Sequence, residues 1–430
     1  MSSRTVDTDK VWNIQASFMA QNTQNTIRNV VEKIKVKPNP DKAPISLSIG
    51  DPTIFGNIRP PQELLKAVRD CVDLDESRSY GPTVGLQSAR QAVAKHCSHQ
   101  GKIFAEDVVL CSGSAHALEM AITVLANPGM NILVPRPGYM IYKTIAEGLG
   151  ITIKFYDLLP NDQWKINLKD LENKLDNNTA AIIIINPSNP CGSVYTEEHL
   201  SEVVDIASRN RVPIIADEIY EFFAFSGHKF TSIACLSKDV PILVCSGLSK
   251  RYLVPGWRMG WLVIHDRNEI FGKDIRNGLF NLSARILGPN KLIQQALPEI
   301  LASIPRDYFN SMMLFIESQA KLAFNKLKDA RGLRPIMPQG AMYMMIEVEM
   351  SIFPQFETET DFVEALFEQQ SVMCIPGQCF YYPSFIRIVL TVPETVLWEA
   401  CSRIQMFCRD RAAEYALIKE TDILELLYLG

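Results

Sequence analysis

The sequence predicts an α/β fold with a mostly parallel central sheet in a large domain, joined to a smaller α+β domain. Helical and strand-like segments alternate from about residue 81 to about residue 300. Several of the strand-like segments are continuous apolar runs, which is typical of strands that helices cover on both faces. After residue 300 the texture changes, because one long helical segment is followed by two separated strands and a final helix.

Periodicity sets the elements of the alternating region. Apolar runs predict strands at 107–110, 131–134, 151–156, 180–185, 212–216, 242–245 and 261–264. Between them, helical spacing predicts helices at 85–100, 114–126, 139–149 and from Thr196, where Thr-Glu-Glu is a helix-opening sequence. In the last part we expect a helix at 306–330, strands at 341–348 and 385–390, and a helix at 394–411.

The two ends of the chain differ in character. Residues 1–24 are polar and predict a mobile arm, whereas 26–36 predict a short helix that Pro38 and Pro40 end. The segment after Arg411 is rich in Leu and Ile. We expect it to form a terminal helix that packs on the smaller domain or across a subunit interface, and a partner-binding helix is the alternative.

Composition excludes several classes of protein. The formal net charge is −5 and there is no basic stripe, so a nucleic-acid partner is not expected. The longest apolar run in the middle of the chain, 180–185, is far shorter than the ~20 residues that a membrane span needs. The ten cysteines show no CxxC pair and do not cluster with the histidines, so no metal site is expected. A polar N-terminus without a signal core favours a reduced, cytoplasmic location.

Ligands of open α/β sheets bind at the carboxyl ends of the strands. Four predicted strands end in polar or turn-forming segments: 111–114, 186–190, 217–220 and 246–251. The last contains Lys250, whose partial burial would favour the neutral, nucleophilic amine. A lone lysine in a loop is more often a surface residue, so its companions decide the interpretation.

Those companions suit one another. Asp217 ends a buried strand, where it would be a helix cap, an ion-pair partner, or a partner that keeps the nitrogen of a pyridine ring protonated. Asn189 and Tyr220 are donors for a phenolate oxygen, although Asn in a turn is common. The turn before Ser114 and Ala115 opens a helix, whose free N–H groups suit a phosphate, as does Arg258.

Taken together, these residues resemble the class I aminotransferases of fold type I, which use pyridoxal phosphate (PLP). The resemblance lies in the ordered motifs Asn186-Pro187-x-Asn189-Pro190-x-Gly192, Asp217-Glu218-x-Tyr220, Ser249-Lys250 and Gly256-Trp257-Arg258. The sequence is most similar to the tyrosine aminotransferase branch, through segments 45–52, 136–139, 251–258, 285–289 and 390–394. The resemblance spans about residues 24–410.

The resemblance implies a role for each position. Lys250 carries the cofactor as a Schiff base and later moves the substrate proton, and Asp217 pairs with the pyridine nitrogen. Further contacts with the cofactor are implied for Asn189, Tyr220, Tyr139, Ser114, Ala115 and Arg258. Tyr80 would contact the cofactor phosphate in the partner subunit of a homodimer. The substrate carboxylate would be bound by Arg387, Gly50 and Asn189.

The resemblance also implies domains and a reaction. Residues 25–80 would contribute to the small domain and the dimer interface, 81–330 would form the large PLP-binding domain, and 331–430 the small one. The expected reaction is ping-pong transfer of the amino group of tyrosine, and also of phenylalanine, to 2-oxoglutarate.

Departures and alternatives stay open. Gly247 stands where many relatives have a phosphate-binding serine, with Ser246 or Ser249 as substitutes. A kynurenine or alanine aminotransferase or a carbon–sulfur lyase would have nearly the same site. A regulatory protein without chemistry is the alternative from another class, but such proteins usually lack the lysine.

Overall fold

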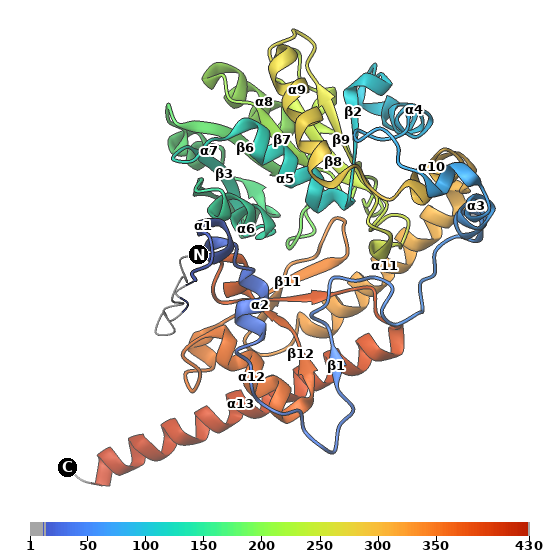
Figure 1. Cartoon of the computed structure of the whole chain (residues 1–430). Helices are drawn as coiled ribbons and strands as arrows, with labels where there is room; N and C mark the ends of the chain where they lie inside the picture. The colour runs from blue at the N-terminus through green and yellow to red at the C-terminus, as the bar shows by residue number, and fades with distance from the viewer. Residues whose placement is uncertain (1–11, 13, 429–430) are drawn as a thin grey trace, which may run out of the picture.

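The computed structural model describes residues 12 and 14–428, with side chains of the last helix described as far as residue 413. Its centre is an eight-stranded sheet in the order β2-β9-β8-β7-β6-β3-β4-β5 (Figure 1). These strands are β2 (Val108–Cys111), β3 (Asn131–Arg136), β4 (Thr152–Leu159), β5 (Lys165–Ile166), β6 (Thr179–Ile185), β7 (Ile214–Asp217), β8 (Ile242–Gly247) and β9 (Gly260–His265). The predicted mostly parallel sheet is confirmed, because β4, β3, β6, β7 and β8 all pair in parallel.

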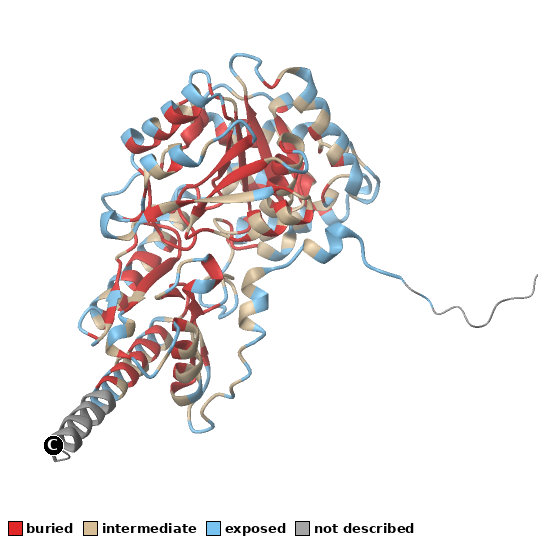
Figure 2. Cartoon of the chain, turned by 90° about the vertical axis from the view of Figure 1, so that its left-hand side faces the viewer, coloured by how far each residue is buried: buried red, intermediate tan, exposed pale blue. Residues whose placement is uncertain are grey.

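Burial on both faces explains why the strands read as continuous apolar runs. In β6, Ile182 and Ile184 belong to the core on one face, and Ile183 and Ile185 belong to the core on the other. Figure 2 shows these strands as the main buried part of the molecule. The helices of this part are α4 (Gln87–His96), α5 (Gly113–Leu125), α6 (Ile141–Gly148), α7 (Leu168–Lys174), α8 (Glu197–Asn210) and α9 (Gly272–Ser283).

A smaller, antiparallel sheet follows, in the order β10-β11-β14-β13. Its strands are β10 (Leu333–Pro335), β11 (Tyr343–Val348), β13 (Ile375–Pro376) and β14 (Phe385–Val389), and its helices are α11 (Arg306–Leu327), α12 (Glu359–Gln370) and α13 (Glu394–Tyr428). The N-terminal segment adds to this part, since β1 (Ile45–Ser46) pairs with β12 (Val372–Met373) and Leu47 is buried in the same core.

The N-terminal end of the chain differs from the sequence prediction, whereas the expected helix after Arg411 is present. Within the segment predicted as a mobile arm, α1 (Phe18–Asn22) forms a helix that lies against α6, and the Thr144 hydroxyl donates to the Gln24 carbonyl at 2.9 Å. The next helix, α2 (Thr26–Val31), is shorter than the predicted one. The last helix continues past Arg411 to Tyr428, because no Pro or Gly interrupts 412–428. Residues 1–11 and 13 of the predicted arm lie outside the described part.

Two further helices, α3 (Gln62–Val72) and α10 (Lys291–Ser303), pack on each other and were not predicted. Pro298 lies inside α10, where a helix is not expected from the sequence. Among the described residues, no helix combines the length and apolar character that crossing a membrane requires.

A backbone junction connects the two sheets beside the predicted site. The Gln339 and Gly340 N–H groups donate to the Gly192 carbonyl at 2.8 and 2.9 Å, and the Ala341 N–H donates to the Phe223 carbonyl at 2.9 Å. Gly192 follows the turn that carries Asn189, and Phe223 follows Tyr220. This junction therefore sets the small sheet relative to two loops of the large one.

We predict that Gly340→Ala destabilises the protein, because a Cβ at this position would lie 2.0 Å from the Phe223 carbonyl oxygen. Overpacking of this kind costs about 1–3 kcal/mol, which thermal or urea unfolding detects. Gly256→Ala is the matched control, since nothing lies within 4 Å of its added Cβ. Equal stability of the two variants would contradict the junction's role.

Candidate active site

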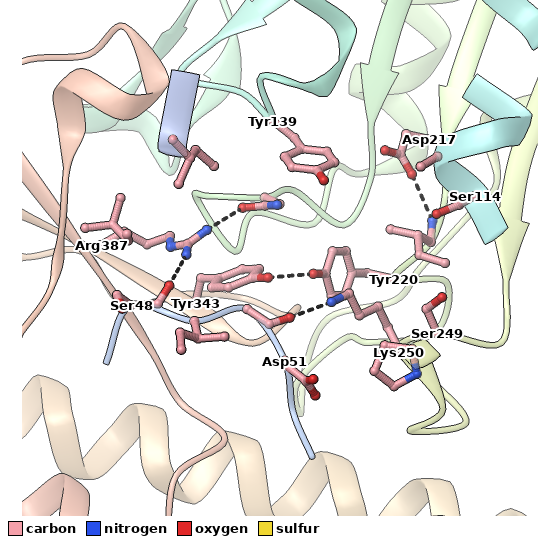
Figure 3. Close-up of a pocket in the computed structure, with 18 of the residues that line it drawn as sticks. Ser48, Asp51, Ser114, Tyr139, Asp217, Tyr220, Ser249, Lys250, Tyr343 and Arg387 are labelled. Atoms are coloured by element: carbon pink, nitrogen blue, oxygen red, sulfur yellow. Dashed lines mark hydrogen bonds between the residues drawn. The ribbon is translucent and has the colours of Figure 1, made fainter. Parts of the chain in front are cut away.

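A cavity of about 670 Å³ lies at the carboxyl ends of β6, β7 and β8 (Figure 3). Residues from both sheets and from the N-terminal segment line it. They include ten of the eleven residues predicted for the site: Gly50, Ser114, Ala115, Tyr139, Asn189, Asp217, Tyr220, Lys250, Arg258 and Arg387. The eleventh, Tyr80, is 84% exposed and is not among the lining residues.

Lys250 lies in the turn that follows β8, with Ser249 on its N-terminal side. Its amine donates to the Gly50 carbonyl at 2.5 Å. Gly50 comes just after the N-terminal strand β1, so this contact joins the start of the chain to the turn after β8. A Cβ on Gly50 would lie 2.6 Å from the Tyr343 hydroxyl, which explains glycine here.

Asp217 is a carboxylate buried at the end of β7, where it is 2% exposed. Its two oxygens accept from the Tyr142 hydroxyl at 2.6 Å and from the Ile219 N–H at 3.2 Å. Burial raises the pKa of Asp217 to about 6, against the lowering effect of both donors and of Lys250. Neither donor carries a positive charge, so the site suits a ligand that brings one.

Arg387, in β14, is a buried cation that no carboxylate of the described chain neutralises. Its guanidinium donates to the Asn189 side-chain oxygen at 3.1 Å and to the Ser48 carbonyl at 2.8 Å, and it lies 4.3 Å above the Tyr343 ring. The Nε atom is buried and has no hydrogen-bond partner in the described part of the chain. A ligand carboxylate would complete this set of partners.

The phenol of Tyr220 is buried and hydrogen-bonds to the hydroxyl of Tyr343 at 2.8 Å. Tyr139 lies across the cavity and meets Tyr142 edge-to-face at 6.0 Å between ring centres. Burial raises the pKa of Tyr139 to about 12, so it stays a neutral ring. Tyr139, Tyr220 and Tyr343 line a partly polar cavity.

The turn between β2 and α5 provides N–H groups at the other end of the cavity. Gly113 has φ +78°, and a Cβ there would lie 2.3 Å from the Arg258 guanidinium, so only glycine lets the two approach. Arg258 donates to the Ser112 carbonyl at 3.3 Å and to the Pro255 carbonyl at 2.9 Å. A helix start beside a guanidinium suits a phosphate group.

The structure explains why Gly247 departs from the serine of many relatives. A Cβ at 247 would lie 2.7 Å from the Met259 carbonyl on β9. Of the two substitutes, Ser246 is directed to the Glu218 carbonyl at 3.3 Å, whereas Ser249 lines the cavity. Of the two serines, Ser249 is therefore the one that borders the cavity.

Comparisons with known proteins agree with this geometry. The protein-family model described as "Aminotransferase class I and II" matches residues 42–404. The chain belongs to this family.

Individual relatives indicate which members of the family the chain resembles. The tyrosine aminotransferase of Homo sapiens is 51% identical over 92% of this chain and 88% of its own length, and that of Dictyostelium discoideum is 41% identical over 92% and 96%. Among solved structures, tyrosine aminotransferase from Leishmania infantum is 32% identical, with a TM-score of 0.89 over 93% of this chain and 99% of that one. Alanine aminotransferase from Pyrococcus furiosus is 29% identical, with a TM-score of 0.85 over 92% and 100%.

This aminotransferase has the groups that PLP requires. The unneutralised Asp217 suits the pyridine nitrogen, the turn at Gly113 suits the phosphate, and Lys250 lines the same cavity. The orphaned Nε of Arg387 suits the substrate's carboxylate. PLP-dependent amino transfer is thus the chemistry that both the family and these residues support.

Sequence reasoning missed Tyr142, the buried donor to Asp217, and several residues that line the cavity. Tyr142 lies three residues after Tyr139, and this i, i+3 spacing on a predicted helix was the signal available. Tyr343, Ser48 and the α2 residues had no such signal, because only the packing of the N-terminal segment on the small sheet brings them to the cavity.

We predict that Asp217→Asn stabilises the cofactor-free protein at pH 8 but not near pH 4. A folded-state pKa of about 6, above the unfolded value, means that wild-type stability falls as pH rises from about 4 through 6. The difference in unfolding free energy should grow with pH to at most about 3 kcal/mol. Urea titrations at both pH values measure it, and a pH-independent difference would contradict the assignment.

Proposed function

We propose that the protein transfers the amino group of an aromatic L-amino acid, tyrosine and also phenylalanine, to 2-oxoglutarate. The products would be 4-hydroxyphenylpyruvate, in the case of tyrosine, and L-glutamate, by a ping-pong mechanism. The observation that carries the proposal is the meeting of Lys250, Asp217 and Arg387 in one cavity. The 51% identity to a tyrosine aminotransferase supports the aromatic substrate.

Each residue would have a distinct task. PLP, when bound, supplies an electron sink for the bond that breaks at the substrate's α-carbon. Asp217 would hold a positive charge on the ring nitrogen, and Asn189 and Tyr220 would donate to the ring oxygen. Tyr139 would stack on the ring, and Ser114, Ala115, Ser249 and Arg258 would hold the phosphate.

The substrate end would be organised by Arg387, which would bind and orient the α-carboxylate with Asn189 beside it. Lys250 Nζ would then take the proton from the α-carbon of the substrate and deliver it to the aldehyde carbon of the cofactor. Its amine donates to the Gly50 carbonyl, two residues along the chain from Ser48, whose carbonyl accepts from Arg387. One amine can therefore serve both the cofactor and the substrate end.

The aromatic side chain would lie against the apolar part of the cavity. Ile27 and Val31 from α2, Ile49, Tyr343 and Ile375 line it together. An alanine aminotransferase remains the second candidate, because that solved structure has a TM-score of 0.85. A cavity of about 670 Å³ with these apolar walls favours the larger, aromatic substrate.

The assembly and location belong to the same proposal. An exposed Tyr80 that is not part of its own cavity lining suits a contact with the cofactor phosphate of a second copy, and so a homodimer. Light scattering of the purified protein measures the mass of the assembly, and so tests the homodimer directly. All ten cysteines are free thiols, which agrees with the proposed cytoplasmic location.

We predict that L-tyrosine, added without an oxo acid, converts the visible band of the holoenzyme to the absorbance of the pyridoxamine form. Lys250→Ala should lower turnover by at least about 10³-fold, because no other amine lines the cavity in the described part of the chain. Stopped-flow spectra and product analysis measure both effects.

Substrates provide the controls for this experiment. A band that stays with tyrosine and falls with alanine would keep the enzyme class and exclude the aromatic substrate. Release of ammonia and a thiol, together with an oxo acid, from a sulfur-containing amino acid would indicate a carbon–sulfur lyase, because transamination keeps the amino nitrogen on the cofactor. Full turnover of Lys250→Ala would contradict the central assignment.

A further inference from the structure

Ping-pong transfer makes one cavity accept two unlike side chains. The ring of an aromatic amino acid is apolar, whereas glutamate and 2-oxoglutarate carry a second carboxylate. Four cationic side chains line the cavity among the described residues: Arg28, Lys250, Arg258 and Arg387. The proposed function occupies the last three, with the cofactor, its phosphate and the α-carboxylate, and leaves Arg28.

Arg28 lies at the substrate end. It is part of α2, whose Ile27, Val30 and Val31 pack on the cluster of Ile375, Cys379 and Phe380. Phe380 lies 5.1 Å from the Arg387 guanidinium, and Ile375 stands opposite Arg387 in the sheet. In Figure 3, Arg387 and Lys250 lie at opposite sides of the cavity. The contacts of α2 place Arg28 near the carboxylate clamp.

The Arg28 side chain is available for a ligand. It is exposed, and its guanidinium has no hydrogen bond or ion pair with any residue in the described part. Glu32, one turn later, also lines the cavity, yet the two do not form an ion pair within 4.0 Å. Other charges at i, i+4 in this chain do pair, such as Lys143 with Glu147.

The two stripes of α2 match the two kinds of substrate. Ile27 and Val31 form an apolar stripe, and Arg28 and Glu32 form a charged stripe beside it, since both pairs have i, i+4 spacing. An aromatic ring can rest on the first stripe without using the second. A second carboxylate can reach the guanidinium, which binds carboxylates bidentately.

We propose that Arg28 binds the distal carboxylate of the dicarboxylic partner, glutamate or 2-oxoglutarate. This inference rests on the proposed function, and it makes α2 a determinant of specificity. Glu32 opposes the same carboxylate, because it has the same charge on the adjacent turn. Asp51 is the other carboxylate besides Asp217 and Glu32 that lines the described cavity.

The test is Arg28→Gln in the PLP-loaded, full-length enzyme, with each half-reaction followed by its spectrum. We expect kcat/KM for glutamate and for 2-oxoglutarate to fall at least about tenfold, the loss of one charge-assisted contact. With tyrosine and with phenylpyruvate, a monocarboxylic oxo acid, it should change less than about twofold, and the visible band should be unchanged.

Two matched variants give the sign of the charge effect. Arg28→Lys should restore part of the lost activity with the dicarboxylic compounds. Glu32→Gln should leave tyrosine unchanged and improve 2-oxoglutarate, the opposite of Arg28→Gln. Equal losses for all substrates, or none for any, would overturn the role of Arg28.

The wild-type enzyme separates this inference from the proposed function. If it uses tyrosine and rejects both dicarboxylic compounds, the role of Arg28 and the 2-oxoglutarate acceptor are both wrong, while the aromatic half-reaction stands. If it rejects tyrosine but loses 2-oxoglutarate activity through Arg28→Gln, the subsite stands and the aromatic substrate is wrong.

Discussion

The cavity depends on the burial of one cation, Arg387. A guanidinium that is 4% exposed is costly unless polar groups surround it, and here they come from three distant parts of the chain. Arg387 lies on the small sheet, Asn189 belongs to a turn of the large sheet, and Ser48 follows the N-terminal strand. Satisfying this one side chain therefore requires the three parts to come together, and the cavity forms where they meet.

The buried carboxylate at the other side of the cavity has the complementary problem. Asp217 has neutral donors only, and burial moves its pKa upward. Both charges are paired incompletely within the described chain, which is unfavourable for stability and favourable for binding. The cationic ring nitrogen of a cofactor would pair with Asp217, and the carboxylate of a substrate would pair with Arg387. The incomplete pairing lowers the stability of the protein alone and raises its affinity for these two ligands.

The sequence predicted what local rules control. Two-sided burial makes strands such as β6 continuous apolar runs, and polar residues after them marked the site, so Asp217 and Lys250 could be found from order alone. Helices such as α10, with an internal proline, could not be found, because tertiary contacts override the local preference. Tyr343 and Ser48 also escaped prediction, since they reach the cavity only through the packing of the small sheet and the N-terminal segment.

The N-terminal segment shows best what a pattern in the sequence leaves out. Residues before about 24 read as a mobile arm because they are polar, and neither α1 within that segment nor α2 just after it has a buried residue. They are held instead by contacts with α6 and with the Ile375–Phe380 cluster. The weakest sequence signals therefore belong to the N-terminal segment at the proposed substrate end of the cavity, and the strongest belong to the residues proposed to hold the cofactor.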